Sequence, residues 1–242
     1  MRYLITLLFF FSVHSFSLAA PIKDFTARYD IYHSETYIGQ TTRRLTNKNN
    51  TLNFSSISKT EGIAAWFVDV TIAETSKLNY KNNQLSFSSY SYDEKKNDTT
   101  KKYKLSTDKA NKLHNSNTNK YYPIVNNLHD PLGFTMAIMQ DMQNGKRELK
   151  YTIAGKSKIK KYTLKFIEKE NIPSNGGHLT SFKMEHYNPK TKERFTLWCV
   201  EDLGFLPVRI HSINRKGNET LLNLTLFNQK IYNLELSEQD SE

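Results

Sequence analysis

The stretch WCVEDLGFLPVRI, residues 198–210, has the pattern of a β-hairpin. In the overlapping segment FTLWCV, residues 195–200, period-two alternation places Phe195, Leu197 and Cys199 on one face of a strand. Two acidic residues and a glycine follow as a turn, and a Leu-Pro-Val run begins the returning strand. We therefore expect two antiparallel strands here, with the cysteine side chain in apolar packing.

Cys199 is the only cysteine of the chain, so an intramolecular disulfide is excluded. A thiol close to Glu201, Asp202 and Arg209 raises the alternative of a nucleophile. A nucleophilic cysteine needs a neighbouring base or a positive field, however, and the strand of Cys199 contains no histidine. The shared face with two large apolar residues favours a buried, protonated thiol that has a structural role.

The same alternation recurs along most of the chain, and polar turn segments rich in Asn, Lys, Gly and Pro separate the runs. The alternating segments are 25–31, 52–55, 68–72, 85–88, 103–105, 149–153, 162–166 and 222–226. About ten or more short strands with short turns indicate an antiparallel sheet that must curl or close. The predicted fold is mainly β, a curved antiparallel sheet or half-open β-barrel, in a single domain over residues 20–229.

One segment, HDPLGFTMAIMQDMQNG at residues 129–145, breaks the pattern and predicts a helix over 130–144. Asp130 suits the start of a helix, and Asn-Gly suits its end. We expect this helix at the mouth or on the concave face of the sheet. Its apolar residues would either line a lipid pocket or fill the core; they are Phe134, Met136, Met139 and Met142.

The segment TEGIAAWFVDV, residues 60–70, contains a second apolar cluster that includes Trp66 and Phe67. If exposed, these rings would form a lip for an apolar ligand or a bilayer surface. The alternative, that they plug one end of the barrel, is favoured because large aromatic residues are usually buried. The candidate ligand-binding residues are Trp66, Phe67, Phe134, Met136, Met139 and Met142.

The sequence contains none of the common catalytic, metal-binding or phosphate-binding motifs. His178 and His186 share a strand face but lie about 27 Å apart at ~3.3 Å per residue, too far to hold one metal. His129 next to Asp130 suggests acid–base chemistry, but Asp130 is better used as a helix cap. We expect no catalytic residue, no metal and no cofactor, and hence not an enzyme.

The two termini have contrasting compositions. The start, MRYLITLLFFFSVHSFSLAAP, reads as a signal peptide cleaved after Ala19, so the mature chain is expected to be exported and soluble. Residues 230–242 are acidic and are expected to form a frayed tail. The formal net charge of +10 is spread over scattered lysines, which favours a solvated surface over a specific anion site and gives no reason to expect nucleic acid as a partner.

Three groups of residues together resemble the bacterial DUF3108 family, a family of unknown function. They are Tyr29 through Gly39, Leu128-His129-Asp130-Pro131-Leu132, and Trp198 with Glu201-Asp202 and Leu206-Pro207-Val208-Arg209-Ile210. The resemblance implies an exported, mostly β protein of the bacterial envelope without an established activity. The family fold also looks similar to the half-barrels of lipoprotein carriers.

The combined expectation is a non-enzymatic periplasmic protein that binds or carries an apolar or amphipathic ligand such as a lipid. The alternative is an envelope structural or adaptor protein whose barrel is filled and which acts through protein–protein contacts. The expected partners are accordingly a lipid or other apolar ligand, an envelope protein, or a membrane surface.

Overall fold

The computed structural model describes residues 23–82, 84–175 and 177–234. The predicted signal peptide and residues 235–242 of the predicted tail lie outside these residues. Within them, no helix is both long enough and apolar enough to span a bilayer.

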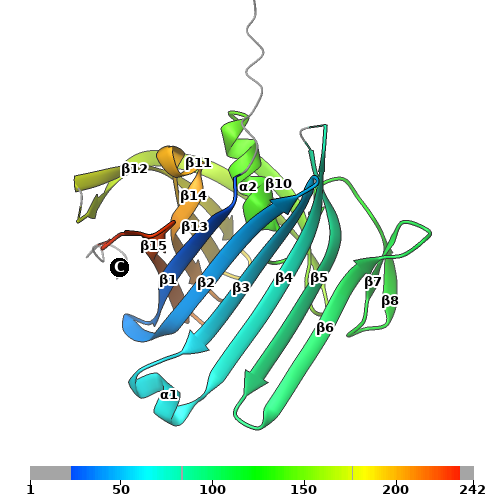
Figure 1. Ribbon diagram of the computed structural model, residues 1–242, viewed down its shortest axis with the longest axis horizontal. Coiled ribbons are helices and arrows are strands. Elements are labelled where there is room, and N and C mark those ends of the chain that lie inside the picture. Colours follow the sequence, from blue (N-terminus) through cyan, green and yellow to red (C-terminus); the bar gives the residue numbers. More distant parts are fainter. Residues whose placement is uncertain (1–22, 83, 176, 235–242) are drawn as a thin grey trace, which may run out of the picture.

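A single 16-stranded sheet dominates the fold (Figure 1). Its strands are β1 (Phe25–His33), β2 (Thr36–Lys48), β3 (Thr51–Thr60), β4 (Val70–Lys81), β5 (Gln84–Lys96), β6 (Thr99–Thr107), β7 (Lys112–Asn115), β8 (Lys120–Pro123), β9 (Leu128–His129), β10 (Glu148–Ala154), β11 (Ile159–Ser174), β12 (Gly177–Asn188), β13 (Glu193–Val200), β14 (Leu206–Ile213), β15 (Glu219–Phe227) and β16 (Lys230–Ile231). The helices are α1 (Ile63–Phe67) and α2 (Phe134–Gln143), with a single turn, η1, at Glu201–Leu203.

The strand order divides the sheet into two halves that meet at one seam. An N-terminal half-sheet, β1–β8, and a C-terminal half-sheet, β9–β15, are joined because β1 pairs with β15. All pairs along the path are antiparallel hairpin neighbours except the parallel pair β9–β10 and this β1–β15 joint. The predicted mainly-β fold with a curved, half-open sheet is confirmed.

The two free ends of the sheet approach one another without forming a ladder. The Asn115 side-chain amide in β7 donates hydrogen bonds to the carbonyl oxygens of Gly155 and Lys156, each at 3.1 Å. This side-chain bridge holds the turn after β10 against the N-terminal half-sheet. The result is a barrel-like shape that is not closed by backbone pairing.

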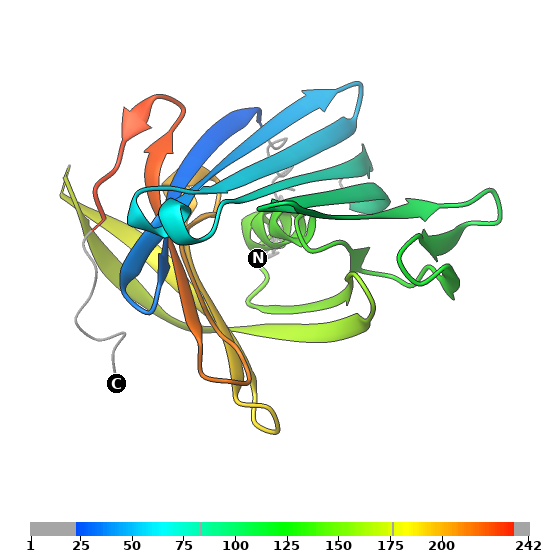
Figure 2. The same cartoon turned by 90° about the horizontal axis from the view of Figure 1, so that it is seen from below.

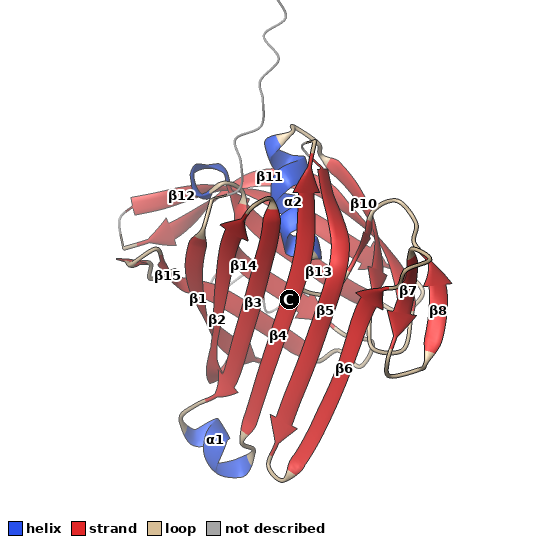
Figure 3. Cartoon of the chain, turned by 45° about the vertical axis from the view of Figure 1, so that its right-hand side comes forward, coloured by secondary structure: helices blue, strands red, loops and turns tan. Residues whose placement is uncertain are grey.

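Helix α2 lies between the two half-sheets (Figures 2 and 3). Met136 and Met139 pack in a core cluster built mainly from the N-terminal half-sheet. Ile138 and Met142 pack in a second cluster built from the C-terminal half-sheet. Because both sides of the helix meet a sheet, seven of its ten residues are buried.

The helix begins later than the sequence predicts, at Phe134 rather than at residue 130. The Asp130 carboxylate accepts hydrogen bonds from the N–H groups of Leu132, at 2.9 Å, and Gly133, at 2.7 Å, and so caps the turn that leads into the helix. The Phe134 N–H then donates to the Asp130 carbonyl oxygen at 3.2 Å. The proposed capping role of Asp130 is therefore correct, although the regular helix starts one turn further on.

Two other segments differ from the sequence-based expectation. Trp66 and Phe67 lie in α1 at the connection between β3 and β4, and they are exposed; they do not plug the barrel. The segment from Lys230 onward begins as strand β16, paired with β15, and Tyr232 is buried. The first residues of the predicted tail therefore complete the sheet.

Candidate ligand-binding site

The hairpin around the cysteine forms as the sequence predicts. β13 and β14 pair in antiparallel register and are joined by η1 and Gly204, whose φ of +67° suits glycine. Cys199 is fully buried in the second core cluster with Leu197, and burial raises the pKa of its thiol far above the usual value. A thiol in this setting is protonated and does not act as a nucleophile.

The candidate ligand-binding residues fall into three different environments. Met136, Met139 and Met142 are buried in the core clusters and line neither of the two cavities described below. Of the two alternatives for these methionines, a lipid pocket or a filled core, the packing favours the filled core, because the helix lies between two sheets instead of against one. Phe134, at the start of α2, does line a cavity, whereas α1 with its two aromatic residues lies elsewhere on the surface.

The cavity that Phe134 lines is here called the basic cavity. It has a volume of about 690 Å³ and lies at one end of the C-terminal half-sheet, beside the start of α2. Its apolar wall consists of Pro131, Phe134, Ile153, Tyr162, Phe195 and Ile213. The basic residues along it are Lys156, Lys158, Lys160, Lys161, Arg194 and Arg215, with one acidic residue, Glu193. Strand alternation turns the side chains of Lys161 and Arg194 to the opposite face of the sheet, so Lys156, Lys158, Lys160 and Arg215 supply the positive charge of the cavity.

The strand register explains the apolar wall. His186 and Phe195 are cross-strand partners, and they lie on the face that carries Met184 and Leu197 deeper in the sheet. Because that face is the one packed on α2, the end of each strand beyond the helix continues the apolar surface into the cavity. The rings of Phe134 and Phe195 meet here at 5.8 Å between centroids, so helix and sheet share the wall.

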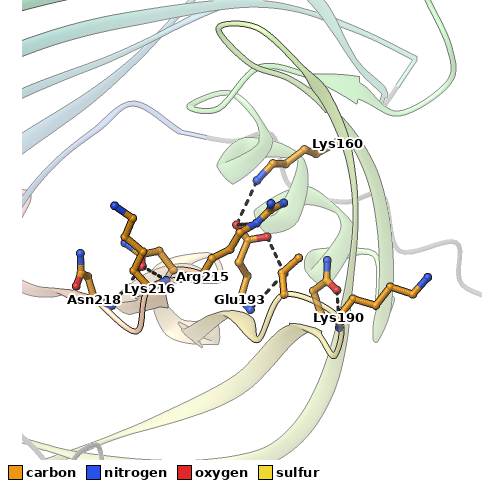
Figure 4. Close-up of polar contacts among 9 residues, drawn as sticks. Lys160, Lys190, Glu193, Arg215, Lys216 and Asn218 are labelled. Atoms are coloured by element: carbon orange, nitrogen blue, oxygen red, sulfur yellow. Dashed lines mark hydrogen bonds and ion pairs between the residues drawn. The ribbon is translucent and has the colours of Figure 1, made fainter.

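Glu193 organises one side of the rim (Figure 4). Its carboxylate lies 3.6 Å from the Lys160 ammonium and 3.4 Å from Arg215 Nε, and it accepts a hydrogen bond from the Thr191 hydroxyl at 2.9 Å. Partial burial acts to raise the pKa of Glu193, but Thr191 and the two cations outweigh it and hold the pKa below its usual value. Glu193 is therefore ionised and joins β11 to the β14–β15 turn.

The remaining basic side chains leave a surplus of positive charge. Arg194 has its own partner, Glu185, at 3.5 Å. Lys156, Lys158 and Lys161 are exposed and have no acidic partner within ion-pair distance among the described residues. Lys156 and Lys158 belong to the turn after β10 that Asn115 holds in place. This part of the positive rim is therefore fixed to the N-terminal half-sheet.

A second cavity, of about 770 Å³, lies on the other side of α2 between β5 and β9. Its wall is polar and contains several Asn, Gln and Ser side chains. The carboxylate of Asp141 is occupied here, because it accepts from Tyr151 at 2.9 Å and pairs with Lys146 at 2.7 Å. This cavity lacks the combination of an apolar wall and unpaired charge that the basic cavity has.

The sequence of the chain is similar to a known protein family. The family described as "Protein of unknown function (DUF3108)" matches residues 28–223, most of the chain. The chain belongs to the DUF3108 family. No curated protein matches its sequence.

Two solved structures are similar to this DUF3108 protein to different degrees. A β-barrel-like protein of the DUF1849 family from Brucella abortus has a TM-score of 0.52 at 8% identity, over 88% of this chain and 99% of that one. A DUF1089 family protein from Pseudomonas aeruginosa has a TM-score of 0.39 at 9% identity, over 86% and 95% of the two chains, which is too low to support an argument. The first of these confirms a barrel-like architecture.

The signature residues of the DUF3108 chain near its C-terminus have a structural role. Trp198 lies on the strand face opposite Cys199 and donates its indole N–H to Glu170. The Arg209 guanidinium lies 5.8 Å from the Trp198 ring centre, and its Nε donates to Asn223 at 2.9 Å. These contacts tie four strands together, and they are separate from the basic cavity.

The residues singled out for possible catalysis are not arranged as a reactive pair. Burial lowers the pKa of His129 to about 4, and its Nδ1 has no hydrogen-bond partner in the part of the chain that the structure describes. Asp130 is used by the helix turn and by the Ser76 hydroxyl, which donates to it at 2.6 Å. Among residues 23–82, 84–175 and 177–234, no group of three or more His, Cys, Asp or Glu side chains is placed to hold a metal.

Sequence reasoning missed the basic cavity because its cations come from separate segments. Lys156, Lys158 and Lys160 precede or begin β11, and Arg215 lies in the β14–β15 turn. The one available signal was that two basic segments fall at the same end of the antiparallel strands. The prediction of a merely solvated basic surface therefore describes this part of the molecule incompletely.

Proposed function

We propose that this DUF3108 protein is a non-enzymatic binding or carrier protein of the bacterial periplasm, and that the basic cavity holds an amphipathic, anionic ligand. The apolar part of the ligand, such as an acyl chain, would lie against Phe134 and Phe195. Its anionic group would lie among the unpaired lysines at the rim. The basic cavity is the single observation on which this proposal rests.

The size and chemistry of the cavity support this choice of ligand. A volume of about 690 Å³ lies within the usual range of ligand pockets, roughly 300–1,000 Å³. Four basic side chains, Lys156, Lys158, Lys160 and Arg215, against the one acid Glu193 favour a negative ligand, while the aromatic and aliphatic wall favours an apolar body. A small polar anion would leave that wall in water, so an amphipathic anion uses the site more fully.

The direct test starts with protein purified from its native envelope without detergent. Organic-solvent extraction followed by mass spectrometry should release an anionic lipid or a fatty acid in near-stoichiometric amount. In parallel, the delipidated protein should bind a fluorescent fatty acid. The double variant Lys156→Glu/Lys158→Glu should weaken that binding by about tenfold or more, because two attractive charges at the rim become repulsive.

A matched control separates the site from the general charge of the protein. Lys77 and Lys81 are exposed, form no ion pair with any described residue and lie outside both cavities. The corresponding double Lys→Glu variant changes the net charge equally and should bind the fatty acid nearly as wild type. An equal loss in both variants, or a native protein that carries no lipid and binds no fatty acid, would rule out the proposed site.

The packing of α2 favours a second candidate function, that of an envelope adaptor with a filled barrel. Met136, Met139 and Met142 fill the core beside the helix, so the space between the half-sheets is occupied there. An adaptor would bind no lipid and would instead bind a protein partner through its surface. The same extraction experiment distinguishes the two, because only the carrier releases a bound amphipath.

A further inference from the structure

We infer that the connection between β3 and β4 is a docking surface for an anionic lipid bilayer. Ile63, Trp66 and Phe67 of α1, here called the apolar tip, have exposed fractions of 72%, 86% and 77%. None of the residues of α1 is buried. Figure 1 shows α1 projecting from one end of the N-terminal half-sheet, away from α2.

The apolar tip is built on an ordered support. The Thr60 hydroxyl donates to the Val68 carbonyl oxygen and accepts from the Val70 N–H, both at 2.9 Å, so the two ends of the connection are tied together. At the start of the connection, the Tyr37 hydroxyl donates to the Glu61 carboxylate at 2.8 Å. Gly62 adopts φ +62°, which lets the chain turn into α1. These bonds hold the apolar side chains out in solvent, where exposure costs free energy unless something covers them.

The size of the tip favours a membrane over a protein partner. Two aromatic side chains bury at most about 500 Å² together, which is less than the ~800 Å² per partner of a standard protein interface. A bilayer needs no matching surface, and tryptophan in particular prefers the boundary between lipid head groups and acyl chains. The tip therefore has the dimensions of an interfacial anchor and lacks those of a dimer contact.

The positive charge of the chain favours an anionic lipid over a neutral one, and lysines lie close to the tip. Lys59, Lys95 and Lys96 lie on the strands next to α1: Lys59 and Lys95 both pair with Thr71, and Lys96 pairs with Val70. None of the three lysines pairs with an acidic group among the described residues. Glu61, Asp69 and Asp98 share this end and equal the lysines in number, so the attraction to a negative surface comes from the formal charge of +10 on the whole chain, which acts over a longer range.

The tryptophans provide a direct test. The chain has two, and Trp198 is only 3% exposed, so a change of tryptophan fluorescence on membrane binding reports on Trp66. Vesicles of phosphatidylglycerol and phosphatidylethanolamine should shift the emission to shorter wavelength and should co-sediment with the protein. Vesicles of phosphatidylcholine alone should cause a smaller emission shift and should co-sediment with less of the protein. Trp66→Ala/Phe67→Ser should reduce co-sedimentation by about tenfold or more, since both rings leave the interface.

Two further variants separate the apolar and the charged contributions. Lys59→Glu/Lys95→Glu/Lys96→Glu keeps the tip and should lose most of the preference for anionic vesicles. Tyr121→Ser removes an aromatic ring that is 57% exposed on β8, far from α1 in sequence, and should bind vesicles as wild type. The melting temperature of Trp66→Ala/Phe67→Ser should stay unchanged, because the replaced side chains are solvated.

Co-sedimentation that is equal for wild type and the Trp66→Ala/Phe67→Ser variant would overturn this inference, as would self-association of the wild type that the variant loses. The latter result would assign the tip to a second copy of the chain. The outcome is independent of the proposed ligand site, because fatty-acid binding in solution without vesicles should be the same in the tip variant and in wild type.

Discussion

Asp130 connects three parts of the protein. It is fully buried, it caps the turn before α2, and it accepts a hydrogen bond from Ser76 of β4. Burial raises the pKa of its carboxyl group from the usual 3.8 to about 6, although the hydrogen bonds from Ser76 and the backbone lower it in part. The carboxyl group therefore links the helix to the N-terminal half-sheet, and its contribution to the free energy of unfolding depends on pH.

The sign of that dependence follows from the raised pKa. The folded state binds the proton more tightly than the unfolded state, so this group favours folding most below pH ~4 and loses its contribution as pH rises to ~6. Asp130→Asn should keep the cap and remove the titration. The free energy of unfolding of the variant minus that of wild type should rise between pH 4 and 6, by roughly 2–3 kcal/mol.

Urea unfolding of both proteins at a series of pH values measures this difference. Taking the difference removes other titrating groups such as His129, whose lowered pKa has the opposite effect. Parallel stability curves for wild type and Asp130→Asn would contradict the assigned role. Asp130→Ala is the matched control: its difference from wild type should change with pH in the same way, but at every pH it should be about 1–2 kcal/mol less stable than Asp130→Asn, because it loses the cap as well.

Cys199 gives a second expectation for a single residue. Cys199→Ser places a hydroxyl among apolar side chains and should lower the free energy of unfolding by ~1–3 kcal/mol if the hydroxyl finds no partner. Fatty-acid binding by the folded variant should equal that of wild type. The native thiol should also react slowly with alkylating reagents; fast alkylation, or loss of binding at an unchanged melting temperature, would argue for a functional thiol.

Helix α2 lies between the two half-sheets, and the surroundings of each of its side chains depend on the direction in which the side chain points. Met139 is 3% exposed in the first core cluster, whereas Phe134 is partly exposed and lines the basic cavity. Adding bulk in a packed core forces neighbouring side chains out of position, while adding bulk beside a cavity takes up empty space. The two positions should therefore respond differently to the same substitution.

Met139→Trp should lower the free energy of unfolding by ~1–3 kcal/mol and leave fatty-acid binding intact once the protein is folded. Phe134→Trp should keep stability close to that of wild type and weaken fatty-acid binding, because the larger ring narrows the cavity. Thermal melts and binding titrations on both variants make the comparison. A stable Met139→Trp variant that no longer binds fatty acid would restore the methionine-lined pocket.

The sequence predicts elements well where the signal is local. Period-two alternation identifies strands such as β1 and β15, and the Asp-Pro start with a Met-rich stretch identifies α2. It does not predict that α2 is buried on nearly all sides, because both half-sheets that cover it come from other parts of the chain. It also fails at α1, where Trp66 and Phe67 look like core residues by type and are exposed in the structure.

At the scale of the whole molecule, the functional surfaces depend on contacts between distant segments. The basic cavity draws its charges from residues 156–160 and Arg215, which no short motif relates. These segments come together because β10 to β15 are consecutive antiparallel neighbours, so the turns at one end of these strands lie side by side. A period-two pattern indicates which face of a strand is buried but not which strand is its neighbour, so the site could not be read from the sequence alone.

The β1–β15 joint also has a consequence for the time course of folding. Along the strand path, every other neighbour is consecutive in the chain, so most of the sheet forms by local hairpin closure. The joint brings together residues as far apart as Thr26 and Asn228, 202 positions along the chain. During synthesis, β1 therefore has an unpaired edge until almost the whole chain has been made, and that edge is a template for wrong pairing with another chain. Pairing of β15 with β1 covers this edge. The time until that pairing forms therefore determines how long the nascent protein can aggregate through β1.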